Sequence, residues 1–301
     1  MTAELRIGFI GVGAMGEPMA RALRRAGFEV TACAHRRREP LERLRADGVD
    51  EAADPAAVAR ESDIVITCVP DSPQVEEALF GPNGASGGAS GRSLTFVDMS
   101  TISPIATRDF AARLEASGHR FVDAPVSGGP VRAADGTLTI MVGAAPDDFR
   151  RVEPVLAAMG TPNHLGPVGL GETVKLVNQL LISTIMLANA EALTFAAKAG
   201  ADLESVRKVI ATATGSNYLL ENWLPKTWFA GTFDGGFAMD LLRKDLAAAL
   251  DAARAMGLAL PVSAIAYQLY TLQSAEGDGS RDYSAVAKFY GRIAAGQAGN
   301  V

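Results

Sequence analysis

A short apolar run that leads into a glycine-rich turn constrains the fold of this chain more than any other feature. Residues 6–10 form a buried strand pattern, and the next six residues read Gly-Val-Gly-Ala-Met-Gly. A helical pattern over residues 18–23 follows the turn, and a second strand pattern follows over residues 29–34. This order of strand, turn, helix and strand predicts a βαβ unit, the building block of a parallel sheet.

Each glycine of the turn has a physical reason in a dinucleotide-binding site. Gly11 permits a tight turn, Gly13 lets a pyrophosphate approach the backbone, and Gly16 lets the helix pack close to the strand. The helix N-terminus offers N–H groups and a positive dipole end to the phosphates. A chain with 31 glycines can contain such a pattern as a purely structural turn, but the flanking strand and helix favour binding. The predicted cofactor contacts are Gly11, Val12, Gly13, Ala14, Met15 and Gly16.

The residues after the second strand indicate which dinucleotide binds. A site that prefers NAD usually has an acidic residue there for the ribose 2′-hydroxyl. This chain has His35, Arg36, Arg37 and Arg38, with no carboxylate before Glu39. Guanidinium groups suit a 2′-phosphate through forked, charge-assisted hydrogen bonds, although a solvated basic helix start is the alternative. We predict NADPH as the preferred cofactor over NADH, with His35, Arg36 and Arg37 as contacts.

Strand and helix patterns alternate through the first half of the chain and then stop. Further strand patterns cover residues 64–69, 93–98, 120–123 and 137–142, whereas helical patterns alone follow, at 172–199, 203–213, 238–256 and 260–275. The fold class is therefore α/β, with an N-terminal Rossmann-type doubly wound sheet and an all-α C-terminal domain. The predicted domains are residues 1–167 and 168–301. Ligands bind at the carboxyl ends of such strands, where the predicted cofactor contacts are Val69 and Pro70.

The segment from Gly169 to Gln179 places polar side chains at the start of a long apolar helix. Lys175 and Gln179 are four residues apart and Asn178 lies between them, so all three can share one helix face. Polar groups that face inward are costly unless a polar partner meets them. A lone lysine at a helix start is usually a solvated residue. The dinucleotide-binding turn, which needs a catalytic partner, favours a catalytic role here.

The loop Ser127-Gly128-Gly129 follows a predicted strand and exposes backbone N–H groups that could cradle a carboxylate. Read alone, it is equally well a flexible turn. Lys244 opens another amphipathic run, where it could face either solvent or a ligand.

Composition excludes several classes of function. A net charge of -6 argues against nucleic acid or an acidic membrane surface as the main partner. Two cysteines, Cys33 and Cys68, indicate no disulfide framework, and both are expected to pack in strands. Three scattered histidines form no metal-binding spacing, so no metal site is predicted.

The location of the protein is an expectation from the same reading. The chain starts directly with a strand pattern, so no signal peptide is expected. The apolar run over residues 180–188 is too short to span a bilayer and contains Ser183 and Thr184. A cytoplasmic location is expected.

Taken together, these motifs resemble the β-hydroxyacid dehydrogenase family over residues 8–293. Four separated motifs match in order: residues 8–16, 123–143, 169–179 and 244–251. The resemblance implies reversible hydride transfer between a nicotinamide cofactor and a small 3-hydroxy acid or its semialdehyde. It assigns proton transfer to Lys175, with Asn178 and Gln179 as positioning groups, and substrate binding to Ser127, Gly128 and Gly129. The resemblance also implies cofactor contacts at Thr101, Phe237 and Lys244.

Two departures from the common family pattern narrow the expected substrate. Many members have glycine where this chain has Arg132, and asparagine where it has Gln179. These residues and the tail at 282–286 resemble the tartronate semialdehyde reductase branch, with Arg132 as a substrate contact. The alternatives are 3-hydroxyisobutyrate dehydrogenase, a glyoxylate or succinic semialdehyde reductase, and a nucleotide-binding regulatory module without catalysis. The imine reductases share the architecture but generally lack the lysine. A homodimer or homotetramer is the family-level expectation for partners.

Overall fold

The computed structural model describes residues 5–35, 37–89, 91–234 and 236–295. By their contacts these form two compact units, the N-terminal unit (Met1–Lys175) and the helical unit (Leu176–Val301). The predicted boundary between residues 167 and 168 lies just before helix α8 (Leu170–Lys198), whereas the division by contacts falls inside that helix. The start of α8, with Lys175, therefore belongs to the N-terminal unit.

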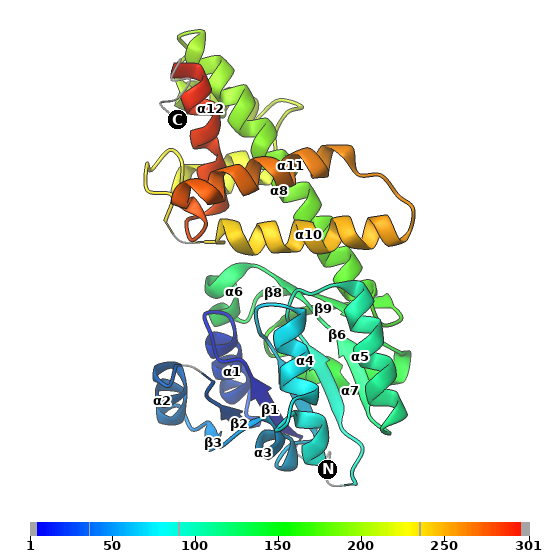
Figure 1. Ribbon diagram of the computed structural model, residues 1–301. Helices are drawn as coiled ribbons and strands as arrows, with labels where there is room; N and C mark the ends of the chain where they lie inside the picture. Colours follow the sequence, from blue (N-terminus) through cyan, green and yellow to red (C-terminus); the bar gives the residue numbers. More distant parts are fainter. Residues whose placement is uncertain (1–4, 36, 90, 235, 296–301) are drawn as a thin grey trace. The chain divides into compact units, whose positions relative to one another are not determined.

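Within the described residues, nine strands form one sheet in the N-terminal unit, in the order β3-β2-β1-β4-β5-β6-β8-β7, with β9 paired to β8 (Figure 1). The first six strands pair in parallel, and β8 runs antiparallel to β6 and β7. The strands are β1 (Arg6–Ile10), β2 (Glu29–Cys33), β3 (Asp50–Ala52), β4 (Ile64–Thr67), β5 (Thr95–Asp98), β6 (Arg120–Asp123), β7 (Val126–Ser127), β8 (Leu138–Gly143) and β9 (Gly160–Gly166).

Helices cover both faces of this sheet because alternate strand residues point to opposite sides. Ile64 and Ile66 of β4 join one core, whereas Val65 joins the other. The first core includes residues of α1 (Gly16–Arg25), α2 (Glu39–Ala46), α6 (Gly129–Asp135) and α7 (Pro146–Ala157). The second includes residues of α3 (Pro55–Arg60), α4 (Ser72–Phe80) and α5 (Pro104–Ala116). Cys33 packs in the second core, as expected.

The strand order reverses at β1, which lies between β2 and β4. The chain moves outward from β1 to β3 and then returns to the other side of β1 to form β4. Connections that leave neighbouring strands in opposite directions open a crevice at the carboxyl ends of those strands. The glycine turn between β1 and α1 lies at this switch point.

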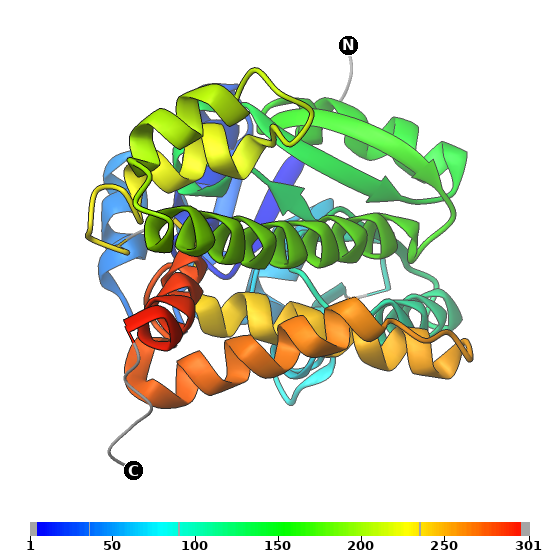
Figure 2. The same cartoon turned by 90° about the horizontal axis from the view of Figure 1, so that it is seen from above.

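The helical unit packs its helices around one apolar core that includes Leu187, Leu246 and Tyr270. Figure 2 shows α8 as one unbroken helix, and α10 and α11 pack side by side. Its other helices are α9 (Leu203–Ile210), α10 (Met239–Ala255), α11 (Pro261–Gln273) and α12 (Ala287–Ala295), with short helical turns at Leu219–Trp223, Leu224–Lys226, Ser274–Asp278 and Tyr283–Val286.

The fold class predicted from the sequence is confirmed, and so are the six strands and five helices that were predicted by residue range. Strands β3, β7 and β9 and helix α12 were missed. β3 is three residues long with both acidic side chains exposed, β7 has two residues, and β9 has three exposed and four half-buried residues. Such strands carry no run of apolar residues, so no local pattern marks them.

Candidate active site

The turn between β1 and α1 has the geometry that a pyrophosphate requires. Gly11 has a φ of +102°, and a Cβ atom there would lie 2.2 Å from the carbonyl oxygen of Cys68. A Cβ atom on Gly16 would lie 2.0 Å from the carbonyl oxygen of Gly11, so only glycine lets α1 approach β1 this closely. Around Gly13, by contrast, no described atom lies within 4 Å of the Cβ position. The turn is therefore tight at both ends and open in the middle.

Helix α1 begins at Gly16, three residues after Gly13, and the N–H of Glu17 donates to the Gly13 carbonyl oxygen at 2.9 Å. Its N-cap residue is Met15, whose side chain offers no oxygen to the N–H groups of the helix start. These N–H groups and the open space at Gly13 fit the phosphates of a dinucleotide. The residues of the turn thus fit an NAD(P) cofactor.

The basic residues after β2 differ in how they are engaged. His35 and Arg37 are exposed, whereas Arg38 forms an ion pair with Glu51 at 2.6 Å. Arg36, predicted to contact a 2′-phosphate, lies outside the described residues. Of this segment, Arg37 is the described guanidinium that remains as a candidate for the phosphate.

The carboxyl ends of β4 and β5 are tied together next to the glycine turn. The N–H of Val69 donates to the hydroxyl of Ser100 at 3.0 Å. Asp98, fully buried, accepts from the hydroxyl of Thr67 at 2.7 Å and from the N–H of Ser100 at 3.1 Å. Val69 and Thr101 are half-buried and Pro70 is exposed, so all three remain accessible at this edge of the sheet.

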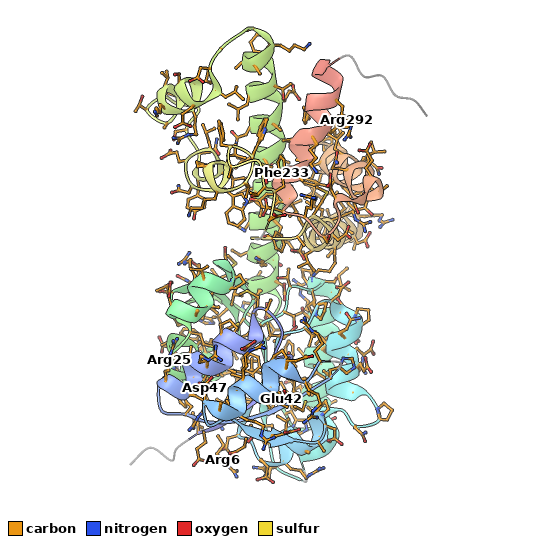
Figure 3. The ribbon with its side chains drawn as sticks, turned by 90° about the vertical axis from the view of Figure 1, so that its left-hand side faces the viewer. Arg6, Arg25, Glu42, Asp47, Phe233 and Arg292 are labelled. Carbon is orange, nitrogen blue, oxygen red and sulfur yellow. The ribbon has the colours of Figure 1, made fainter. Side chains whose placement is uncertain are left out.

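The predicted substrate loop lies between β7 and α6. Ser127 pairs with Thr139 of β8 and is half-buried, while Gly128 and Gly129 have φ values of +138° and +70°. The stem of Arg132 packs over Gly128, because a Cβ atom there would lie 2.8 Å from the Arg132 Cβ. Its guanidinium is exposed and donates to the carbonyl oxygen of Thr137. The helix α6 itself is tied to α1 by Arg25 (Figure 3), which donates to the carbonyl oxygen of Ala134.

Lys175 is buried in the second turn of α8, with 8% of its surface exposed. The helix start is held by Asp123, the last residue of β6, which accepts N–H bonds from Gly169 at 2.7 Å and Glu172 at 2.8 Å. Sequence reasoning placed Asp123 in a family motif but gave it no role. The signal for such a role was an aspartate within a buried strand, because a buried carboxylate needs hydrogen-bond donors around it.

In the helical unit, a chain of hydrogen-bonded polar side chains runs from α8 to α10. Gln179 and Asp245 are buried, and Asn178 and Lys244 are half-buried. The amide of Asn178 donates to the Gln179 side-chain oxygen at 3.0 Å, and the Gln179 amide donates to Asp245 at 2.7 Å. Lys244 forms an ion pair with Asp245 at 2.7 Å. Gln179 and Asp245 are only 1% and 2% exposed, so their hydrogen bond is shielded from water.

Asp245 is a second residue that sequence reasoning left without a role. The spacing of apolar residues along α10 could have indicated that Asp245 is buried. The buried residues of this helix include Leu242, Asp245, Leu246 and Ala249. A carboxylate within an apolar helix stripe indicates a buried partner.

Phe237 is held in place by a single carboxylate. Its N–H donates to Asp282 at 3.1 Å, and its ring meets that of Tyr283 edge to face. Asp282, 1% exposed, also accepts from the indole N–H of Trp223 at 3.0 Å and from the N–H of Ser284 at 2.9 Å. Three donors on one buried carboxylate define the backbone position of Phe237.

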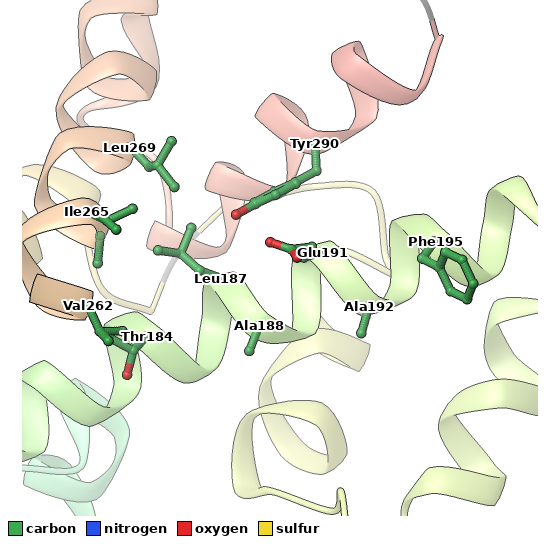
Figure 4. Close-up of a pocket in the computed structure, with 11 residues that line it drawn as sticks. Thr184, Leu187, Ala188, Glu191, Ala192, Phe195, Val262, Ile265, Leu269 and Tyr290 are labelled. Atoms are coloured by element: carbon green, nitrogen blue, oxygen red, sulfur yellow. The ribbon is translucent and has the colours of Figure 1, made fainter.

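A groove of about 690 Å³ lies in the helical unit, and none of the predicted site residues lines it. Residues of α8, α11 and α12 form it, among them Leu187, Ile265 and Leu269 (Figure 4). Glu191 and Tyr290 are its polar side chains near α12, and Phe195 at its edge is 77% exposed. The groove is thus a mainly apolar surface feature separate from the predicted contacts.

Comparison with known proteins agrees with this arrangement. Residues 6–176 match the NAD binding domain of 6-phosphogluconate dehydrogenase, and residues 169–290 match the NAD-binding region of NADP-dependent 3-hydroxyisobutyrate dehydrogenase. The chain is 42% identical to 2-hydroxy-3-oxopropionate reductase of Escherichia coli (strain K12), with 94% of this chain and 96% of that protein covered. It is 40% identical to 2-(hydroxymethyl)glutarate dehydrogenase of Eubacterium barkeri, with 96% of each covered.

Among solved structures, Mycobacterium tuberculosis 3-hydroxyisobutyrate dehydrogenase with L-serine superimposes with a TM-score of 0.88. The two are 32% identical, and 95% of this chain and 98% of that one are covered. Fold, glycine turn and relatives together define an NAD(P)-dependent oxidoreductase that acts on CH–OH groups. The chain belongs to the β-hydroxyacid dehydrogenase family.

Proposed function

We propose that this enzyme transfers hydride reversibly between NADP(H) and a small 3-hydroxy acid, with tartronate semialdehyde (2-hydroxy-3-oxopropionate) as the carbonyl substrate. The observation that carries this proposal is Lys175, a buried lysine on a helix start that is anchored to the same sheet as the open glycine turn. A buried cation loses solvation, and titratable groups buried at a binding site are candidates for acid–base catalysis.

The compounds that appear in the names of the relatives and of the solved structure support the chemical class. 2-Hydroxy-3-oxopropionate, 2-(hydroxymethyl)glutarate, 3-hydroxyisobutyrate and L-serine all have a one-carbon alcohol or aldehyde on C2 of a carboxylate. They differ in the second group on C2. The shared part predicts one anchor for the carboxylate and one acid–base group for the oxygen, while the variable group decides specificity.

The bound nicotinamide supplies the hydride in reduction and accepts it in oxidation. The ammonium of Lys175 donates a proton to the carbonyl oxygen during reduction, and its neutral amine accepts the proton during oxidation. The hydroxyl of Ser127 and the N–H groups of Gly128 and Gly129 bind the carboxylate. Gln179, held by Asp245, orients Asn178, which in turn positions the substrate hydroxyl.

Arg132 is proposed to select the substrate. Its guanidinium is exposed on α6, one turn beyond the carboxylate loop, and only part of its hydrogen-bonding capacity is taken by the Thr137 carbonyl oxygen. A second polar group on C2, such as the hydroxyl of tartronate semialdehyde, would be its partner. The alternatives are 3-hydroxyisobutyrate dehydrogenase activity and reduction of glyoxylate or succinic semialdehyde.

The preference for NADPH over NADH is also part of the proposal. Arg37 is exposed after β2, and Arg38 beside it is already paired with Glu51. The described residues 34–35 and 37–38, which follow β2, include no carboxylate that could bind a ribose 2′-hydroxyl. The first acidic residue is Glu39, at the start of α2.

A panel of carbonyl acids tests the substrate. Tartronate, methylmalonate and succinic semialdehydes and glyoxylate are each incubated with enzyme and NADPH, then with NADH, and kcat/KM is measured from the nicotinamide absorbance. The proposal expects the highest kcat/KM for tartronate semialdehyde with NADPH. A tenfold preference for methylmalonate semialdehyde would instead assign the enzyme to 3-hydroxyisobutyrate.

We further propose that the enzyme is a cytoplasmic homo-oligomer in which a second copy covers the apolar groove. The apolar run over residues 180–188 was expected to be too short for a bilayer, but α8, which contains it, is long and apolar enough to cross a membrane. Of its most apolar window, 33% is buried. That helix also holds Glu191 within the groove, and its Asn178 and Gln179 belong to a hydrogen-bonded polar chain, which suits a protein surface better than lipid. Phe195 protrudes beside the groove, so two copies could each insert this ring into the other.

A further inference from the structure

The carboxylate of Asp123 is completely buried, and both of its oxygens face the first turn of α8. Oδ1 accepts from the N–H of Gly169 at 2.7 Å, and Oδ2 accepts from the N–H of Glu172 at 2.8 Å. Lys175 follows Glu172 by three residues, less than one helical turn. A displacement of this turn relative to the sheet therefore moves the lysine by a similar amount.

Two glycines are fitted against the same carboxylate. A Cβ atom on Gly143 would lie 2.4 Å from Oδ1 of Asp123, and one on Gly171 would lie 2.8 Å from Oδ2. The Gly171 Cβ would also lie 2.4 Å from the carbonyl oxygen of Met141. Glycine inside a helix is less favourable than alanine. Gly171 is therefore best explained by the close approach of α8 to β6 and β8.

The charged form of Asp123 is costly in this place. Burial raises the pKa of Asp123 to about 6, and the charge of Asp98 on the neighbouring strand β5 adds to the shift. The other charged groups around the helix start are Glu172 on α8 and Arg108 on α5, whose guanidinium lies beside Gly169. The two N–H bonds from α8 act in the opposite direction and favour the carboxylate.

We propose that Asp123 is the positioning residue for Lys175, because its two hydrogen bonds set the place and rotation of the first turn of α8. This inference rests on the proposed role of Lys175 in proton transfer. Catalytic groups displaced by about 1 Å lose on the order of 100-fold in rate, so a carboxylate that holds the helix start is required for turnover rather than for folding alone.

The proposal has a consequence for the pH dependence of turnover. A protonated carboxyl group presents its own O–H to one of the two N–H donors, so it keeps only one of the hydrogen bonds. Turnover of the wild type is therefore expected to fall below about pH 6. The effect on stability has the opposite sign, since a raised pKa gives a contribution that is present at low pH and lost as the pH rises through about 6.

The test uses two variants of the full chain that disturb the anchor from opposite sides. Asp123→Asn replaces one acceptor by a donor, and Gly171→Ala pushes the helix away while improving its helix propensity. The matched control is Asp54→Asn, because Asp54 caps α3 in the same unit by accepting from the N–H of Ala57 at 2.7 Å. Turnover is counted per NADPH-binding site, and hydrogen exchange of residues 169–176 is followed in the NADPH complex.

Both variants are expected to lower kcat by about 10–100-fold per site, to leave KM and the NADPH dissociation constant within about threefold, and to speed exchange at residues 169–176. The step near pH 6 in kcat should be absent from Asp123→Asn, and Asp54→Asn should match the wild type throughout. Faster exchange with unchanged kcat per site, or a retained step near pH 6, would overturn the proposal.

The proposed function can fail separately. If the wild type reduces no semialdehyde, hydrogen exchange and the reactivity of Lys175 toward a small amine-specific reagent still test the anchor. Changed reactivity of Lys175 together with faster exchange in both variants supports positioning by Asp123. Unchanged reactivity in both variants rejects it.

Discussion

Lys175 and Lys198 lie on the same helix but in different surroundings. Lys175 is buried near the start of α8, whereas Lys198 is exposed in its last turn. If Lys175 is the proton donor, Lys175→Ala should lower kcat by about 10²–10⁴-fold, while NADPH affinity stays close to wild type. Lys198→Ala is the control and should change neither. Steady-state kinetics with the preferred semialdehyde measure kcat, and fluorescence titration measures NADPH affinity. If Lys175→Ala keeps more than a third of normal turnover, Lys175 is not the proton donor.

The arginines after β2 test the cofactor preference. Replacing Arg36 and Arg37 together by alanine should weaken NADPH far more than NADH, because each forked contact to a 2′-phosphate is charge-assisted. Arg38→Ala serves as the control, since its guanidinium is held by Glu51. The two Michaelis constants decide the outcome. Equal losses for both cofactors, or a wild type that prefers NADH, would mean that these arginines are a solvated surface.

Arg132 tests the choice of substrate. Arg132→Gly should lower the preference for tartronate semialdehyde over methylmalonate semialdehyde by about 1–3 kcal/mol, the cost of a polar group left without a partner. The ratio of the two kcat/KM values is the measurement. The structure also offers another role, because the Arg132 stem packs over Gly128 and its guanidinium bonds to Thr137. In that case both kcat/KM values fall together and their ratio does not move.

Among the secondary-structure elements, the turn between β1 and α1 contains two glycines with different roles, Gly16 in folding and Gly13 in cofactor binding. Gly16→Ala would place a Cβ atom 2.0 Å from the Gly11 carbonyl oxygen, so we expect a lower melting temperature, with a loss of about 1–3 kcal/mol from overpacking. Gly13→Ala meets no described atom within 4 Å, so the melting temperature should be nearly unchanged without cofactor. Cofactor affinity should nevertheless drop, because the added methyl group occupies the space of the pyrophosphate.

Melting curves with and without NADPH distinguish these two effects. The wild type should gain stability from the cofactor, since a ligand that binds only the folded state shifts the equilibrium. Gly13→Ala should lose most of that gain. If Gly13→Ala keeps the full gain, then the pyrophosphate does not approach the backbone at this residue.

For the molecule as a whole, the exposed apolar surface of the helical unit indicates an interface with a second copy of the chain. Phe195 and Ile265 are 77% and 63% exposed at the groove. Phe195→Asp should shift the protein toward monomers, because a charge cannot enter an apolar interface without loss of solvation. Light scattering coupled to size-exclusion chromatography measures the mass. Val209→Asp on α9 is the control, since Val209 is also exposed but does not line the groove. A monomeric wild type would exclude a second copy as the occupant.

Local patterns in the sequence were enough to predict the βαβ alternation, the change to helices after residue 168 and the tight glycine turn. These features depend on local causes: the periods of strand and helix, and the steric freedom of glycine. It also placed Lys175 on a helix, because apolar spacing over a long segment is a local signal. Strands without an apolar pattern, such as β9, carry no local signal and could not be predicted from the sequence.

Hydrogen bonds between residues far apart in the chain could be identified only from the tertiary structure. The bonds of Asp123 to Gly169 and Glu172 join residues 46 and 49 positions apart, and that of Gln179 to Asp245 joins residues 66 apart. No local period encodes such pairs. They form because the sheet order and helix packing bring buried polar groups together, and a buried carboxylate must find a donor wherever the fold supplies one.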